Sequence, residues 1–137
     1  MAASAHHHGY TWIGSGLEML KDGPRRSVHP EFRSSRVPPL ENADWLKKPA
    51  SFVQGTWDDL KEAAHWFGEQ AKEHAPEFSS AHAREVLADT IASAAEMVAG
   101  GQDAIGGWWL TGQRFLSVCL IGCSLHRFRP EYPCPKP

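Results

Sequence analysis

Three consecutive histidines, His6 to His8, are the residues whose type and spacing most clearly suggest chemistry. Neighbouring imidazoles bind zinc, nickel or copper. In regular structure, three consecutive side chains cannot surround a metal tetrahedrally, so such a site would need further ligands. A flexible tail or the remnant of a purification tag explains the triplet without any metal. We therefore predict no metal ligand and no cofactor, and leave open whether His6–His8 binds a metal.

The cysteines are the second group with chemical potential. Cys119 and Cys123 are four positions apart in an apolar run, and a helix would place both thiols on one buried face. With Cys134 the count is odd, so at least one thiol is free or paired between chains. We expect the cytoplasm or another reducing intracellular compartment. A metal at this cluster would need Cys134 and His126 as further ligands, and the spacing matches no standard zinc pattern.

A third group, Glu62, His65 and Glu69, falls on one polar face of a predicted helix. Di-iron bundles use the Glu-x-x-His spacing twice, together with further glutamates, and this chain has it once. Acid–base catalysis would require a cleft that buries these groups. A solvated helix face is the simpler interpretation, so we predict no enzyme. A small metal-binding protein or enzyme that uses these groups stays as an alternative.

Charge and hydropathy exclude some partners. The chain has 14 Lys and Arg against 16 Asp and Glu, a net charge of −2, and its basic residues form no stripe. Nucleic-acid binders normally show such a stripe, so we expect no nucleic acid. The continuous apolar part of residues 115–125 is too short to cross a bilayer. We therefore expect no membrane span.

Hydrophobic periodicity predicts a mainly α fold, a small three-helix bundle in residues 51–127. Apolar residues at spacings of three and four follow a helix start at Thr56, and Pro76 ends that helix. A second helix is predicted from Ser79 or Ser80 to the stop at Gly100-Gly101. The third element, residues 103–127, is apolar on most sides, which favours a buried helix. Residues 115–121 also suit a strand.

The ends of the chain are poor in core residues. Residues 1–50 are predicted to form an extended, proline-containing arm with short helical turns, and residues 128–137 a proline-rich tail. Aromatic and arginine side chains are the usual anchors of interfaces. The arm interleaves both kinds, and the residues that we predict to contact a partner are Tyr10, Trp12, Arg25, Arg26, Phe32, Arg33, Arg36 and Trp45.

These patterns favour a non-enzymatic protein-binding module. It would be an accessory subunit of a larger assembly, or a small inhibitor or adaptor that binds a partner protein of unknown identity. A self-associating helical protein, and so a homo-oligomer, is a further alternative because the third element is strongly apolar.

Overall fold

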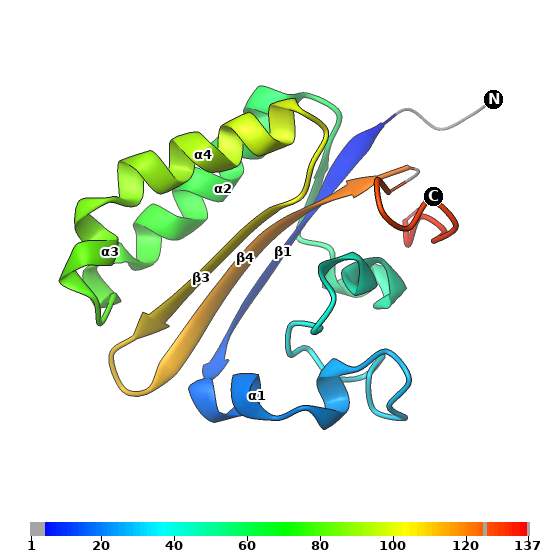
Figure 1. The fold of residues 1–137 in the computed structure, drawn as a ribbon, viewed down its shortest axis with the longest axis horizontal. Coiled ribbons are helices and arrows are strands. Elements are labelled where there is room, and N and C mark those ends of the chain that lie inside the picture. Colours follow the sequence, from blue (N-terminus) through cyan, green and yellow to red (C-terminus); the bar gives the residue numbers. More distant parts are fainter. Residues whose placement is uncertain (1–4, 125, 137) are drawn as a thin grey trace.

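The computed structural model describes residues 5–124 and 126–136, and a four-stranded antiparallel sheet forms its centre (Figure 1). The spatial order of the strands is β2-β1-β4-β3. Their bounds are β1 His6–Ser15, β2 Gly55–Trp57, β3 Ala104–Leu110 and β4 Arg114–Cys123. The predicted three-helix bundle is therefore wrong, because both ends of the chain contribute strands to one sheet.

The helices lie mostly between β2 and β3 in the sequence. Their bounds are α1 Gly16–Leu20, α2 Leu60–His74, α3 Ala81–Glu85 and α4 Leu87–Ala99. Short 3-10 turns occupy Gly23–Arg25, Asn42–Lys47, Ala50–Phe52 and Ala75–Glu77. Among the described residues, no helix combines the length and the apolar character that a membrane crossing requires.

The helices predicted between residues 56 and 100 are present, with a later start for the first. The Asp59 carboxylate accepts hydrogen bonds from the backbone of Lys61 and Glu62, so Asp59 caps α2. Thr56 lies in β2 instead. Ser80 caps α3 as expected, because its hydroxyl accepts from the backbone of Ala83. The predicted second helix is divided at Val86 into α3 and α4.

The third predicted helix is a β-hairpin. Residues 116–123 of β4 are all buried because both faces of this inner strand are covered. Such a strand has no alternating polar positions, and its continuous apolar run resembles that of a buried helix. The turn between β3 and β4 needs left-handed backbone at Gly112 (φ 78°) and Gln113 (φ 58°), a conformation that glycine adopts easily.

A separate core lies on each face of the sheet. Helices α2 and α4 cover one face, and the segment between β1 and β2 covers the other together with the C-terminal tail (Figure 1). The helix-side core contains Phe67, Phe78, Val98, Trp108, Leu116, Val118 and Leu120, among others. The second core contains Tyr10, Trp45, Leu46, Phe52, Cys119, Ile121 and Cys123.

The first fifty residues are an integral part of this fold. Strand β1 is an inner strand that pairs with β4 over its whole length. After it, residues 16–54 cross the second face, where Lys48 is 1% exposed and donates hydrogen bonds to the carbonyls of Phe32 (2.7 Å) and Ser35 (2.6 Å). Several apolar residues of the first fifty positions are therefore buried against the sheet of the same chain.

Candidate metal centre

Strand geometry brings two histidines and a cysteine together on one face of the sheet. Side chains alternate between the two faces of a strand, so His6 and His8 point to the same face and His7 to the other. In the register of β1 and β4, His6 lies directly opposite Cys123. Directly opposite residues share a face, so Cys123 joins the two histidines.

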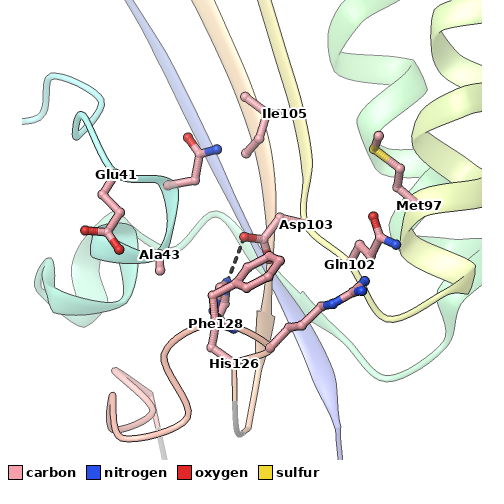
Figure 2. Close-up of a pocket in the computed structure, with 10 residues that line it drawn as sticks. Glu41, Ala43, Met97, Gln102, Asp103, Ile105, His126 and Phe128 are labelled. Atoms are coloured by element: carbon pink, nitrogen blue, oxygen red, sulfur yellow. Dashed lines mark hydrogen bonds and ion pairs between the residues drawn. The ribbon is translucent and has the colours of Figure 1, made fainter.

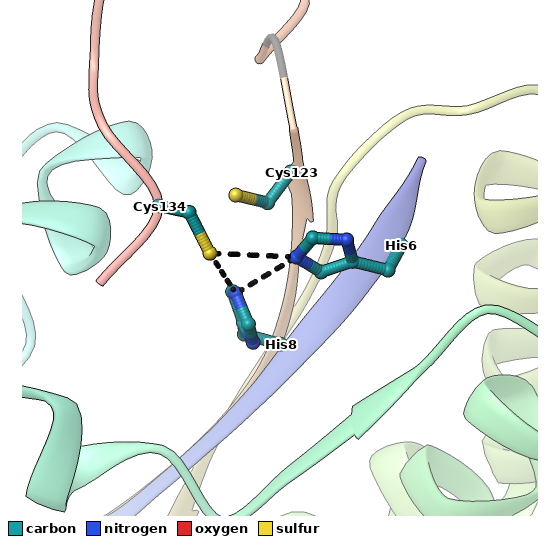
Figure 3. A group of neighbouring side chains, drawn as sticks. All are labelled: His6, His8, Cys123 and Cys134. Carbon is teal, nitrogen blue, oxygen red and sulfur yellow. Dashed lines mark hydrogen bonds between the residues drawn. The ribbon is translucent and has the colours of Figure 1, made fainter. Parts of the chain in front are cut away.

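The fourth member of the group comes from the tail. Cys134 lies in the tail, eleven positions after the end of β4 at Cys123, and it packs against the second core. The potential ligand atoms of His6, His8, Cys123 and Cys134 all lie within 4.8 Å of one another. Figure 3 shows these side chains converging from β1, β4 and the tail on one point.

The separations fit a tetrahedral ion. The Nε2 atoms of His6 and His8 are 3.1 Å apart, and the Sγ atom of Cys134 lies 3.4 Å from His8 Nε2 and 3.6 Å from His6 Nε2. In tetrahedral zinc, bonds of about 2.0–2.1 Å to nitrogen and about 2.3 Å to sulfur place two nitrogens about 3.3 Å apart, and nitrogen and sulfur about 3.5 Å apart. The ligand atoms of His6, His8 and Cys134 therefore have the separations of a zinc coordination shell, and the Cys123 sulfur lies within 4.8 Å of them.

Burial favours the neutral imidazole of His8 and the protonated thiol of Cys123 as long as no cation is present. His8 is fully buried, and this burial, followed by the proximity of His6, lowers its pKa to about 4. Burial and the neighbouring Cys134 raise the pKa of the Cys123 thiol to about 12. A divalent ion with two thiolates and two neutral imidazoles has no net charge, which suits a partly buried position.

A hydroxyl next to the site orients one of its ligands. Thr56 lies directly opposite His8 in the pairing of β1 with β2, and its Oγ1 is 2.8 Å from His8 Nδ1. When Nε2 faces the ion, Nδ1 carries the proton and donates it to this oxygen. Outer contacts of this kind fix the tautomer and the ring orientation of metal-bound histidines.

Tyr10 lies on the same face of β1 as His6 and His8, and it is fully buried. The Tyr10 hydroxyl has no hydrogen-bond partner among the described residues. Burial, followed by the electrostatic influence of Cys123, Cys134 and Cys119, raises the pKa of Tyr10, which places this phenol in the neighbourhood of the thiols.

Contacts on the other side of the strands hold the ends of β1 and β4. His7 donates from Nε2 to the carbonyl of Gln102 at 3.0 Å. The next residue, Asp103, accepts from the backbone of Gly122 (2.8 Å) and from Nε2 of His126 (2.7 Å). The loop after α4 therefore holds the residues adjacent to three of the four potential ligands.

The pairing of Asp103 with His126 is structural. Nδ1 of His126 accepts from the backbone of Phe128 and Arg129, so both ring nitrogens are engaged. The pair borders a hollow of about 460 Å³ (Figure 2). With neither nitrogen available to a substrate, His126 anchors the tail, and it is not the metal ligand that the sequence suggested as a candidate.

The polar residues of the first predicted helix lie on the surface of α2, where Glu62, His65 and Glu69 border an open hollow of about 420 Å³. His65 and Glu69 are mostly exposed on α2, with 4.0 Å between His65 Nε2 and a Glu69 oxygen. Glu62 is exposed on the same helix. These positions agree with a solvated helix face.

The residues predicted to bind a partner make their contacts within the chain. Tyr10, Phe32 and Trp45 are buried, and the rings of Tyr10 and Trp45 stack with centroids 4.6 Å apart. Trp12, which is half-buried, lies over Gly14.

The four arginines are engaged in the same way. Arg25 donates to the carbonyls of Met19 and Pro38, Arg26 pairs with Asp22, Arg33 donates to the carbonyl of Lys47, and Arg36 lies over the Phe52 ring. Whether a partner also touches the exposed arginines stays a prediction, but the buried aromatic residues have no surface left to offer.

The sequence did not predict this site, because the histidines were assigned to an extended arm and Cys123 to a helix. A strand interpretation of the first residues would have separated His6 and His8 from His7, since only alternate side chains share a face. The tail cysteine carries no such signal, because its return to the sheet depends on tertiary contacts.

Comparisons of the chain with models of protein families, with curated proteins and with solved structures find no match.

Proposed function

We propose that this protein binds one zinc ion through His6, His8, Cys123 and Cys134, and that the ion has a structural role. The observation that carries the proposal is the convergence of four potential ligand atoms, from two strands and the tail, within 4.8 Å. Two imidazoles and two thiolates are a common donor set of structural zinc.

A structural role follows from the number of ligands. Catalytic zinc keeps a coordination position for water or substrate, whereas four protein ligands fill a tetrahedral shell. The protein would accordingly be non-enzymatic, and it would work in a reducing intracellular compartment, where thiolates are kept available. We favour metal binding over the predicted protein-binding module, because three of the four aromatic anchors of that module, Tyr10, Phe32 and Trp45, are buried within the chain.

The test is the metal content of untagged protein washed with a weak chelator. We expect one zinc per chain by elemental analysis, and we expect cobalt substitution to give the intense visible bands of a tetrahedral thiolate site. His8→Gln and Cys123→Ser should each abolish stoichiometric binding, since three ligands hold the ion far less tightly.

Two matched variants distinguish this site from adventitious binding to a histidine run. In a flexible histidine tract, substitution of any one histidine would lower the metal affinity equally. In this fold His7 points away from the site. His7→Gln and Cys119→Ser should therefore retain one zinc per chain, with unchanged circular dichroism as the folding control. Equal loss in His7→Gln and His8→Gln, or no bound metal in the wild type, would refute the proposal.

A further inference from the structure

The two cysteines of the metal centre are placed to react with each other. Their Sγ atoms lie within 4.8 Å, and a disulfide requires about 2.05 Å. Cys123 is held by the end of β4, whereas Cys134 lies in irregular chain after the strand. The tail can therefore supply the remaining movement without any disturbance of the sheet.

Exposure distinguishes these thiols from the third. Cys134 is partly exposed, Cys123 is 4% exposed, and Cys119 is 2% exposed. Burial raises the pKa of Cys119 to about 11, and its sulfur contacts the hydroxyl of Ser117 rather than another thiol. An oxidant thus meets Cys134 first, Cys123 is the nearest thiol to resolve the product, and Cys119 is inert.

We infer that mild oxidation by a peroxide exchanges the zinc ion for a disulfide between Cys123 and Cys134, so that the metal centre responds to redox conditions. This inference rests on the proposed function.

The chemistry needs a peroxide as the external reactant and balances as follows. The Cys134 thiolate attacks one peroxide oxygen, the O–O bond breaks, and a sulfenic acid and hydroxide form. The Cys123 thiolate then attacks that sulfur and displaces a second hydroxide as the S–S bond forms. Two electrons pass from the thiolates to the peroxide, and two protons from solvent convert the hydroxides to water. Zinc is left with two imidazoles and dissociates.

The new bond would preserve one function of the ion. A disulfide between Cys123 and Cys134 closes the same stretch, residues 124–133, that the two metal bonds close. The tail therefore stays attached to β4 while the ion and both histidine ligands are released. The expected outcome is a change in metal content without unfolding, which a thiol reductant and added zinc reverse.

The experiment treats zinc-loaded wild-type protein with increasing hydrogen peroxide. Released zinc is followed with a chromophoric chelator, and non-reducing peptide mapping identifies the bonded cysteines. We expect one zinc released for each Cys123–Cys134 disulfide, unchanged far-ultraviolet circular dichroism, and recovery after dithiothreitol and zinc. The Cys119→Ser variant should behave identically.

Three results would overturn the inference. The protein could keep its zinc at peroxide concentrations that oxidise a control thiol protein. Zinc could be released with Cys134 over-oxidised and no disulfide formed, or the disulfide could involve Cys119. Failure of the proposed function is recognised separately, because the protein then contains no stoichiometric zinc before peroxide is added. In that case the exchange is refuted as well, since no ion is present to be displaced.

Discussion

At the scale of single residues, the proposed metal centre is flanked by side chains that would touch no metal. The Thr56 hydroxyl oxygen is 2.8 Å from His8 Nδ1, and His7 contacts the carbonyl of Gln102 from the opposite face of β1. Strand alternation therefore directs the imidazoles of His6 and His8 to the proposed zinc site and that of His7 to the loop after α4. The same three residues in a helix or a flexible tail would have no such division.

Thr56→Val tests whether the hydroxyl positions His8. The substitution keeps the shape of the side chain but removes the acceptor of the Nδ1 proton. Loss of an outer-shell partner typically costs about 10–100-fold in metal affinity, and we expect a loss of that size in competition titrations with a zinc chelator.

Thr56→Ser is the matched control for that titration, because it retains the oxygen and should restore most of the affinity. A cobalt spectrum that keeps its tetrahedral bands would show that the ligands themselves are unchanged. Equal affinities of the valine variant and the wild type would contradict a positioning role.

At the scale of elements, local signals predicted the helices, and tertiary context decided the strands. Capping residues and apolar spacing located the helical segments around Phe67 and Val98, both of which are buried as expected. Strand β4 could not be predicted in the same way, because a strand with two covered faces has no period-two pattern. What covers its second face is the segment around Lys48, whose place is set by contacts distant in sequence.

The covering segment has a pH-dependent anchor in Lys48. Burial lowers the pKa of this ammonium group to about 8, against about 10.4 in an unfolded chain. Between these values the unfolded state binds more protons, so the contribution of Lys48 to the free energy of unfolding rises with pH. The neutral amine can still donate to the carbonyls of Phe32 and Ser35.

Urea unfolding of zinc-saturated wild type and Lys48→Met at pH 7.5 and 9.5 checks this expectation. The variant loses both hydrogen bonds and no longer titrates at this position. The difference in free energy of unfolding between wild type and variant should therefore increase with pH, by up to about 3 kcal/mol over the full titration range of Lys48. Because thiol and tyrosine titrations are common to both proteins, they cancel in the difference. A pH-independent difference would show that Lys48 is not desolvated.

At the scale of the whole molecule, the metal centre joins the start of β1, the end of β4 and the tail. Other contacts of the tail include the packing of Tyr132 against the second core, the buried pair of His126 with Asp103 (2.7 Å), the hydrogen bond from the Tyr132 hydroxyl to Asp44 (3.0 Å), and the exposed ion pair of Arg129 with Glu41 (2.6 Å). Exposed ion pairs of this kind stabilise by about 0–1 kcal/mol. His126 and Tyr132 hold the first part of the tail. Zinc would add an attachment at Cys134, while the two cores hold the sheet without it.

Removal of zinc should consequently loosen one part of the molecule more than the rest. A ligand present at about 1,000 times its dissociation constant stabilises the native state by about 4 kcal/mol, and chelation should lower the midpoint of thermal unfolding accordingly. Hydrogen exchange should accelerate most in residues 126–136 and least in the centre of β4, where Val118 and Leu120 are fully buried. Cys134→Ser is the informative variant, because it should exchange like the metal-free protein whether zinc is added or not. If chelation instead accelerated exchange evenly across both cores, the ion would be required for the entire fold, and the division between a self-sufficient sheet and a metal-fastened tail would be wrong.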